Sequence, residues 1–367
     1  MKKILGLFVV CILLMQSALA LGYVKPEFSW PQRGITSAHT ANANWEISDS
    51  VMCENPMVLK EMVHGAATWG DLIYLTGANG SLFCVTKNGE LIFAQRVSEK
   101  PIGVPLIDDA GAYVFTQSGI LMKFDRVSGE KLWESKVSNG GVTDIARYGN
   151  YVVFGSEKGL HCIDITNGIR LWNTSLPSDP QPVAISSFRV VVNYTSGLRC
   201  LSLLNGKTLW EAKIKQTTID ETYFTGTPTI HFNMVYIGLS DGRVQSFNLY
   251  NGNMVWEAKK GFSQANPTAD STRLWLPSGD KIVCMSAKTG DIIWEKKVAD
   301  WVIWSQIVKT KNFLIAACQC ERVYLVNPDT GETIKTLDIN KQSTQDIAVG
   351  TDYFVVIDNS KYLYIFK

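Results

Sequence analysis

The side chains that could carry out chemistry here are histidines, cysteines and carboxylates, and the histidines do not form a recognisable site. The four histidines lie in different segments, without a metal-binding spacing such as His-x-x-x-His: His39, His64, His161 and His231. His161 directly precedes Cys162, but neighbouring residues on a strand point to opposite faces, so the two cannot act as base and nucleophile. The sequence has no Gly-x-Ser-x-Gly elbow, phosphate-binding loop or dinucleotide glycine pattern. We therefore predict that the protein is not an enzyme and has no catalytic, cofactor-binding or metal-binding residues.

Four cysteines occupy the same position in four different structural units, two residues before a turn-forming residue: Cys84, Cys162, Cys200 and Cys284. A disulfide needs Cα atoms within about 7 Å, and equivalent positions of separate units are farther apart, so we expect four buried thiols. Cys318 and Cys320 are separated by one residue on a predicted strand and point to the same face. That spacing is poor for a mutual disulfide and incomplete for a metal site. The redox state of this pair stays open.

Carboxylates from distant parts of the sequence could still meet in a ring-shaped fold. The acidic candidates in or beside inner strands and connecting loops are Asp144, Asp220, Glu221 and Asp300. Charged residues in loops are most simply explained by solvation, so we assign no catalytic role to these four.

A repeat of nearly constant length determines where all these side chains lie. Successive repeat glycines are 40, 39, 38, 46, 38 and 41 residues apart: Gly89, Gly129, Gly168, Gly206, Gly252, Gly290 and Gly331. Asp, Asn, Ser or Thr precedes each glycine by three or four residues. A large aromatic residue follows by four in all cases but the last, where Lys335 stands: Phe93, Trp133, Trp172, Trp210, Trp256 and Trp294. Glycine takes the positive-φ position of the turn, and each tryptophan can bury roughly 200 Å², so we predict that these aromatic residues dock adjacent units.

Each unit contains short apolar segments rich in β-branched and aromatic residues, typical of four strands. A period of this length predicts an all-β fold, a single β-propeller with four-stranded blades. The sequence after Gly350 contains two apolar segments but no further repeat glycine, while the segment around Trp45 resembles an outer strand without a blade. We therefore predict eight blades, the last closed by the N-terminal strand around Trp45. A seven-bladed ring is the alternative.

The N-terminal sequence has the pattern of a secretory signal peptide. Lys2 and Lys3 precede an apolar segment, which ends before the small-residue site Ala18-Leu19-Ala20. The apolar segment is too short for a membrane span. We expect an exported protein, periplasmic or extracellular, that has no integral membrane span after signal cleavage and is a monomer.

The predicted organisation is a signal peptide at 1–20, an N-terminal segment including the closing strand at 21–56 and a propeller at 57–367. Without Lys2 and Lys3, 33 basic residues stand against 34 acidic ones, a net charge of −1. This balance provides no electrostatic attraction to nucleic acid or to an anionic membrane, and we predict no nucleic-acid partner.

Two segments outside the repeat are candidates for binding a partner. The 46-residue spacing adds a long connection that contains Gln216, Thr217, Thr218, Ile219, Asp220 and Glu221. Two tryptophans after the sixth repeat glycine, Trp301 and Trp304, do not occupy the docking position. Loops on a rigid ring commonly carry binding residues, so we predict that these eight residues contact a partner. A neutral insertion and a core role for one tryptophan are the alternatives.

The repeat resembles that of the pyrroloquinoline-quinone-type (PQQ-like) β-propeller family. The clearest copies are Asp125-Arg126-Val127-Ser128-Gly129-Glu130-Lys131-Leu132-Trp133 and Ser286-Ala287-Lys288-Thr289-Gly290-Asp291-Ile292-Ile293-Trp294, and the resemblance covers nearly the whole chain after the signal peptide. Members with dehydrogenase activity use a quinone, a calcium ion and an aspartate base. Other members are non-catalytic, and the chain is similar in size, blade number and export signal to outer-membrane β-barrel assembly factors.

The resemblance implies an exported scaffold that binds other envelope proteins, in outer-membrane protein assembly or envelope biogenesis. Two alternatives remain open. One is a small quinoprotein dehydrogenase that depends on pyrroloquinoline quinone, and the other is a propeller that binds an envelope ligand or glycan.

Overall fold

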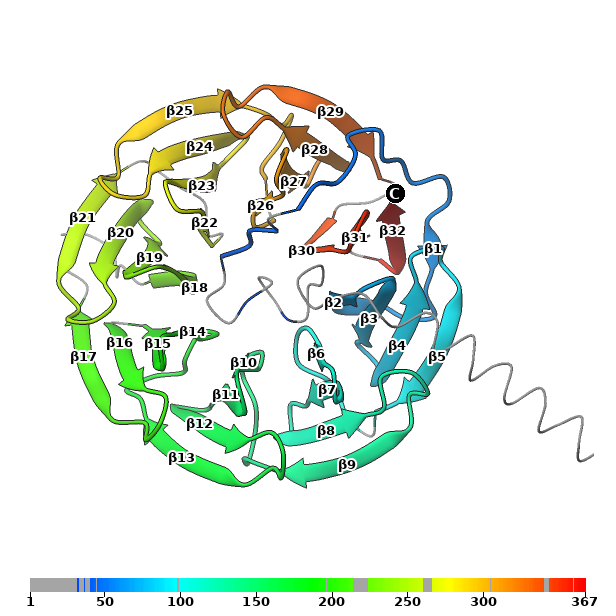
Figure 1. Ribbon diagram of the computed structural model, residues 1–367, viewed down its shortest axis with the longest axis vertical. Coiled ribbons are helices and arrows are strands. Elements are labelled where there is room, and N and C mark those ends of the chain that lie inside the picture. Colours follow the sequence, from blue (N-terminus) through cyan, green and yellow to red (C-terminus); the bar gives the residue numbers. More distant parts are fainter. Residues whose placement is uncertain are drawn as a thin grey trace, which may run out of the picture.

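The structure is a computed structural model that describes residues 32, 36, 40–43, 45–97, 99–195, 197–213, 224–259, 266–303, 305–339, 343–358 and 360–367. The predicted signal peptide lies outside the described residues. The described strands form eight separate four-stranded sheets, arranged as the blades of a ring (Figure 1). The prediction of an eight-bladed all-β propeller is therefore confirmed, and the seven-bladed alternative is wrong.

In seven blades the four strands pair in sequence order, from the inner strand to the outer one. Blades 1 to 4 consist of β2 (Val63–Trp69), β3 (Leu72–Gly77), β4 (Ser81–Thr86) and β5 (Leu91–Arg96); β6 (Leu106–Asp108), β7 (Gly111–Phe115), β8 (Ile120–Phe124) and β9 (Lys131–Lys136); β10 (Ala146–Tyr148), β11 (Tyr151–Ser156), β12 (Gly159–Asp164) and β13 (Arg170–Ser175); and β14 (Ala184–Ser186), β15 (Arg189–Tyr194), β16 (Gly197–Ser202) and β17 (Thr208–Lys213).

Blades 5 to 7 consist of β18 (Phe224–His231), β19 (Met234–Leu239), β20 (Arg243–Asn248) and β21 (Met254–Lys259); β22 (Thr268–Ala269), β23 (Arg273–Ser278), β24 (Lys281–Ser286) and β25 (Ile292–Lys297); and β26 (Val308–Lys309), β27 (Leu314–Cys318), β28 (Arg322–Val326) and β29 (Thr333–Asp338). Blade 8 combines β30 (Ser343–Val349), β31 (Phe354–Asp358) and β32 (Tyr362–Phe366) with β1 (Met57–Val58) from the other end of the chain.

The ring has two faces, which differ in the connections they carry. The turns that join first to second and third to fourth strands lie on one face, here called the glycine face because it carries the repeat glycines. The turns between second and third strands and the connections between blades lie on the other, here called the connection face. Antiparallel pairing within each blade produces this division, because alternate turns leave opposite ends of the sheet.

Side chains of the turn residues hold the repeat turns on the glycine face. Asn327 Oδ1 accepts hydrogen bonds from the backbone N–H groups of Asp329 (2.8 Å) and Thr330 (3.1 Å), and Asn248 and Asp125 do the same in their own turns. The glycine that follows has positive φ, for example 74° at Gly331. These Asx turns explain why Asp or Asn recurs at this point of the sequence.

Neighbouring blades meet where the aromatic residue of one outer strand lies against the repeat glycine of the next blade. A Cβ atom built on Gly206 would lie 2.7 Å from Trp172 Cε3, and one on Gly252 would lie 2.6 Å from Trp210 Cδ2. The two indole N–H groups donate to the carbonyls of Leu203 (2.7 Å) and Leu249 (2.8 Å) in the following blade. Glycine thus leaves the space that the ring of the preceding blade fills.

The four repeat cysteines lie directly opposite the aromatic position on the adjacent strand. Cys84 pairs with Phe93, Cys162 with Trp172, Cys200 with Trp210 and Cys284 with Trp294. All four are fully buried and free, so the prediction of buried thiols is confirmed. Burial raises the pKa of each thiol to about 12, which keeps it protonated and unreactive at neutral pH.

An N-terminal strand closes the last blade, as predicted, but it is not the segment around Trp45. The closing strand is β1, in which Met57 pairs with Leu363 and Val58 with Tyr362 of β32. β1 begins at Met57, directly after the predicted N-terminal segment 21–56. Because a tryptophan marks most of the other outer strands, the sequence points to Trp45 for the closing strand. The strand that pairs with β32 contains only Met57 and Val58 and has no tryptophan.

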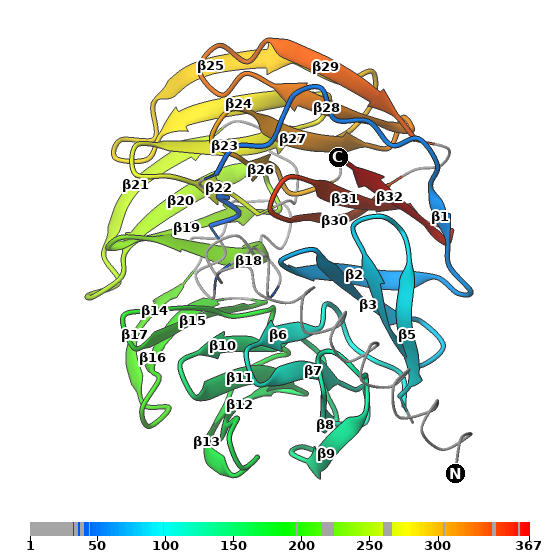
Figure 2. The same cartoon turned by 45° about the vertical axis from the view of Figure 1, so that its right-hand side comes forward.

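The segment from Thr40 to Val51 crosses the glycine face from near the inner strands of blades 6 and 7 toward β1 (Figures 1 and 2). Its backbone pairs with β26, since Ala43 N–H donates to the Lys309 carbonyl (2.7 Å) and Lys309 N–H to the Ala41 carbonyl (2.9 Å). Trp45 is buried and its indole donates to the carbonyl of Gly350 in blade 8 (2.8 Å). The segment therefore joins blades 7 and 8 as a strap rather than as a strand of either.

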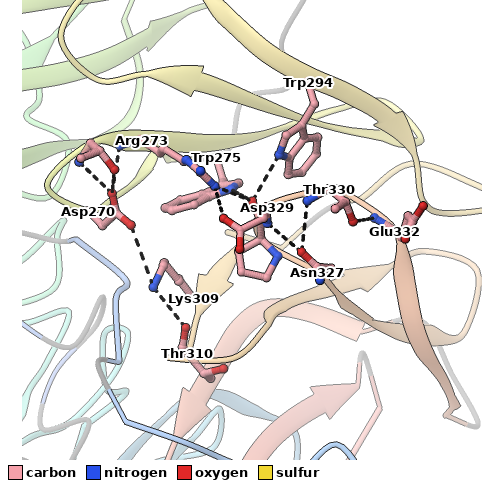
Figure 3. A network of polar contacts seen from close by, with 12 residues as sticks. Asp270, Arg273, Trp275, Trp294, Lys309, Thr310, Asn327, Asp329, Thr330 and Glu332 are labelled. Carbon is pink, nitrogen blue, oxygen red and sulfur yellow. Dashed lines mark hydrogen bonds and ion pairs between the residues drawn. The ribbon is translucent and has the colours of Figure 1, made fainter.

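A polar network joins blades 6 and 7 beside this strap (Figure 3). Arg273 Nη1 donates to Asp329 Oδ1 (2.5 Å), and the indoles of Trp275 and Trp294 both donate to the Pro328 carbonyl at 3.3 and 3.2 Å. Lys309 Nζ lies 4.0 Å from Asp270 Oδ2 and 5.7 Å from the centre of the Trp275 ring. Burial lowers the pKa of Lys309. Because each of these groups has a partner within the junction, we assign the network a structural role.

Within the described residues, no helix has the length and apolar character needed to span a membrane.

Candidate partner-binding surface

Trp301 is the predicted binding residue that the structure describes best, and it projects from the connection face. Its side chain is 62% exposed, which is unusual for the largest apolar side chain. The other predicted residues, Gln216, Thr217, Thr218, Ile219, Asp220, Glu221 and Trp304, lie outside the described residues. Of the eight predicted binding residues, Trp301 is thus the one that the described structure contains.

The backbone on both sides of Trp301 is anchored to blade 6. The N–H groups of Val298 and Ala299 both donate to the Asp280 carbonyl at 3.0 Å, and Ile303 N–H donates to the Gly279 carbonyl at 2.8 Å. Asp280 and Gly279 form the turn between β23 and β24. The connection that carries Trp301 is thus fixed before and after the tryptophan, so the exposed indole projects from a rigid support.

The β27–β28 turn of blade 7 supports the same connection from the other side. Gln319 N–H donates to the Val302 carbonyl (3.1 Å), and Ile303 forms an isolated antiparallel bridge with Cys318. Cys318 and Cys320 form a disulfide, with their Cα atoms 5.1 Å apart. A disulfide across one residue stiffens the turn on which the connection rests.

The prediction that the spacing of Cys318 and Cys320 is poor for a mutual disulfide is therefore wrong. It assumed that both residues lie on one extended strand. Cys318 is the last residue of β27, and Cys320 already lies in the turn before β28, so the chain bends between them. The bend allows the two sulfur atoms to meet.

Charged side chains surround the base of the Trp301 connection. Arg322 Nη1 forms an ion pair with Asp300 Oδ2, and Arg322 Nε lies 3.3 Å from Asp338 Oδ1. Hydrogen bonds to Tyr324 and Asp338 raise the pKa of the Arg322 guanidinium. Sequence reasoning missed Arg322 and Asp338, because their association with Asp300 depends on strand pairing between β28 and β29.

The acidic candidates are not brought together in the described structure. Asp144 is buried in the connection between blades 2 and 3, where its Oδ1 accepts a hydrogen bond from Val104 N–H (3.1 Å). Asp300 lies in the connection between blades 6 and 7, on the opposite side of the ring (Figure 1). Asp220 and Glu221 lie outside the described residues. Among the described residues, no three His, Cys, Asp or Glu side chains form a group that could hold a metal ion.

A family model described as outer membrane protein assembly factor BamB matches this chain. The matches cover residues 37–196, 182–301 and 240–317, which overlap and together exceed half of the sequence. The matched region includes blades 1 to 6 and the Trp301 connection.

Curated relatives are distant. An uncharacterized protein of Rickettsia conorii is 25% identical over 208 residues, 52% of this chain and 49% of its own length. Outer membrane protein assembly factor BamB of Yersinia pestis is 19% identical over 296 residues, 71% of this chain and 72% of its own length. The chain spans about half the length of the two Rickettsia proteins it matches, at 49% and 54%.

Solved structures with different functions share the fold. BamB from Moraxella catarrhalis superposes with a TM-score of 0.71 at 15% identity, covering 86% of this chain and 99% of that chain. A europium-containing methanol dehydrogenase superposes with a TM-score of 0.73 at 10% identity, covering 93% of this chain and 91% of that chain. At such identities the likeness concerns the fold alone.

Proposed function

Because this chain belongs to the outer membrane protein assembly factor BamB family, we propose that it is an exported, non-catalytic propeller that binds other envelope proteins during outer-membrane protein assembly. The observation that carries the proposal is the exposed Trp301 on a connection fixed from two sides. Tryptophan is enriched among the residues that dominate the affinity of protein interfaces. A rigid support lowers the entropy lost on binding, which strengthens such a contact.

The charges beneath Trp301 suit the polar rim of an interface. The ion pairs of Arg322 with Asp300 and Asp338 are exposed, so they contribute little to the stability of the fold. Around a buried aromatic anchor, such charges steer association and select partners. The proposed partner surface is therefore an apolar pocket for the indole, bordered by charged or polar groups.

The test is binding of the purified protein to the barrel-inserting component of the outer-membrane assembly machinery. We expect Trp301→Ala to weaken this binding by about tenfold or more, because truncating an anchor tryptophan typically costs about 2 kcal/mol or more of binding free energy. Leu132→Ala is the matched control, because Leu132 is 50% exposed on the outer strand β9, away from the connection face. Equal affinities of wild type and Trp301→Ala would reject Trp301 as the anchor.

The dehydrogenase alternative concerns a class of enzymes that shares this fold, as the methanol dehydrogenase structure does. Among the described residues, no three His, Cys, Asp or Glu side chains gather as ligands of a metal ion, and Asp144 Oδ1 accepts a hydrogen bond from Val104 N–H. Retention of added pyrroloquinoline quinone with calcium, together with dye-linked alcohol or sugar oxidation, would favour the alternative.

A further inference from the structure

Two phenylalanines project from neighbouring turns of the glycine face. Phe188 lies in the turn between β14 and β15 of blade 4, and Phe232 in the turn between β18 and β19 of blade 5. Phe188 is 51% exposed and Phe232 is 69% exposed, the largest exposed fraction among the large apolar side chains of the described residues. Neither side chain belongs to the core clusters of blades 3 to 5. Within its own blade the Phe232 ring meets the ring of the adjacent His231, with centroids 4.5 Å apart, and most of its surface stays exposed.

The backbone at these turns is one that bulky residues avoid. Phe188 has φ 57° and Phe232 has φ 50°, both in the left-handed region that favours glycine. Blades 1 and 3 have glycine at the position of Phe232, namely Gly70 (φ 62°) and Gly149 (φ 60°). A phenylalanine there costs conformational energy that glycine would avoid, and such strain concentrates at functional sites.

The equivalent turns of other blades show that this position does not need a large apolar residue. Five blades join their first two strands by two-residue turns: Gly70-Asp71, Asp109-Ala110, Gly149-Asn150, Ser187-Phe188 and Phe232-Asn233. Only the turns of blades 4 and 5 contain a large apolar residue. The repeat architecture therefore does not require one, and its presence is particular to this sector of the ring.

Further exposed side chains make the two turns part of one surface. Phe188 meets Tyr148 of blade 3 edge to face with ring centres 5.3 Å apart, and the Arg189 guanidinium lies 4.4 Å from the centre of the Tyr250 ring in blade 5. Leu204, in the turn between β16 and β17, is 57% exposed, and Leu203 next to it donates its N–H to the Phe188 carbonyl (2.9 Å). We call Phe188, Leu204, Phe232 and Tyr250 the aromatic sector.

The charged residues within the turns of this sector are basic. The four turns that form it, residues 186–189, 203–207, 231–234 and 249–253, contain Arg189 and Lys207 and no carboxylate. His231 in the third turn has a pKa lowered by burial, although Asp270 acts in the opposite direction. The sector is thus apolar and locally basic on a molecule whose total charge is close to neutral.

We propose that the aromatic sector docks this protein onto an anionic lipid bilayer. The side chains of Phe188, Leu204 and Phe232 stand at the tips of turns and have no polar atom, so they can enter the boundary between headgroups and acyl chains. The Tyr250 ring combines an apolar body with a polar hydroxyl, as is common at membrane interfaces. Arg189 and Lys207 lie beside the tips and complement anionic headgroups.

A lipid surface explains these features better than a glycan or a protein. Saccharide recognition pairs aromatic stacking with several hydrogen-bonding side chains, whereas the most exposed tips here are hydrocarbon. A protein anchor usually enters a pocket as one cluster, whereas these tips are distributed over adjacent turns of blades 4 and 5, as several shallow insertions into a bilayer would be. Binding to such a surface increases with the apolar area buried and with the attraction to anionic lipids.

The experiment is flotation of the purified protein without the predicted signal peptide, residues 21–367, with vesicles of phosphatidylethanolamine and phosphatidylglycerol. We expect wild type to float with these vesicles, to float less in high salt, and to bind vesicles of phosphatidylcholine alone only weakly. The variant Phe188→Ser/Phe232→Gly should lower the partition coefficient by about tenfold or more. This variant should remain folded, because Phe232→Gly introduces the residue that blades 1 and 3 already use; circular dichroism checks it.

Two controls separate this proposal from the protein-binding function of the connection face. Trp301→Ala should bind vesicles like wild type, and Phe188→Ser/Phe232→Gly should bind the assembly component like wild type. Leu132→Ser removes an exposed aliphatic side chain from the rim and should leave flotation unchanged. Failure of wild type to float, or equal flotation of the double variant, would overturn the lipid proposal. Binding of isolated peptidoglycan that the double variant loses, without flotation, would assign the sector to a glycan instead.

Discussion

The indole of Trp172 donates its N–H to the Leu203 carbonyl in the next blade, 2.7 Å away, while the same ring covers Gly206 of that blade. The contact combines a buried hydrogen bond with close packing at one point of the junction. Trp210 and Leu249 repeat it one blade later at 2.8 Å. Each such junction thus joins a specific indole to a specific carbonyl, which fixes how adjacent blades are oriented.

Replacing Trp172 by phenylalanine should destabilise the fold by about 1–3 kcal/mol. The ring is largely retained, but the buried Leu203 carbonyl loses its indole donor. Urea unfolding followed by intrinsic fluorescence and circular dichroism measures the change. Trp301→Phe is the control, since Trp301 is exposed, and its free energy of unfolding should stay within about 0.5 kcal/mol of wild type. Equal effects of the two substitutions would contradict the role of the indole bond.

Alanine at two equivalent repeat glycines should have unequal effects. Gly89 and Gly206 both have positive φ, at 81° and 69°, so alanine costs about 1 kcal/mol of backbone strain at either. A Cβ at Gly206 would lie 2.7 Å from Trp172, whereas one at Gly89 would have no neighbour within 4 Å. Gly206→Ala should therefore cost roughly a further 1–3 kcal/mol by overpacking. Thermal and urea unfolding of both variants measures the difference, and equal losses would show that the aromatic contact is not tight.

Reduction of the Cys318–Cys320 disulfide should affect partner binding more than stability. The disulfide closes a ring of very few residues, so the entropy it removes from the unfolded chain is small. It nevertheless stiffens the turn that supports Val302 and Ile303. Cys318→Ser/Cys320→Ser should weaken binding through Trp301 about threefold, by roughly 0.6 kcal/mol, while the melting temperature changes little. A large fall in melting temperature would instead indicate that the disulfide stabilises blade 7 as a whole.

Stability should decrease as pH falls from about 7.5 to 5, because burial lowers the pKa of His161. In the unfolded chain the pKa of His161 is about 6.5. In the folded protein burial holds its pKa below that value, so the side chain takes up a proton only at lower pH. At pH values above the pKa of the unfolded chain, His161 is neutral in both states and its contribution to stability is fully present. This contribution is lost as the pH falls through the lower pKa of the folded protein. His161→Gln should show a shallower decrease in the free energy of unfolding. Parallel profiles for both proteins would mean that other groups dominate.

Removal of the closing strand should make the protein self-associate. A variant beginning at Lys60 lacks β1, which leaves the backbone of β32 as an unpaired edge. Size-exclusion chromatography with light scattering should detect oligomers or aggregates that increase with concentration. A variant beginning at Ser48 loses Trp45 and its bond to Gly350 but keeps β1, and should remain monomeric though less stable. Monomeric behaviour of the first variant would show that closure is not needed to protect the edge.

Local patterns in the amino-acid sequence predict the repeat of the fold and the burial of its most regular positions. The spacing of the glycines, the aromatic residue four places later and the cysteine opposite it are local patterns. They arise because a turn, a pleated strand and a docking ring each depend on residues close together in the sequence. An eight-bladed count followed from the unfinished last repeat and the unassigned N-terminal segment.

Which residues close the ring, and which meet on its surfaces, depends on the three-dimensional arrangement of the blades. Met57–Val58 rather than the segment around Trp45 completes blade 8, because pairing with β32 depends on register across the whole chain. Cys318 and Cys320 join because the chain bends at the end of β27. Phe188 and Phe232 come from different repeats and occupy a common surface only because adjacent blades bring equivalent turns together. Such relations depend on contacts between residues distant in sequence, which no local pattern encodes.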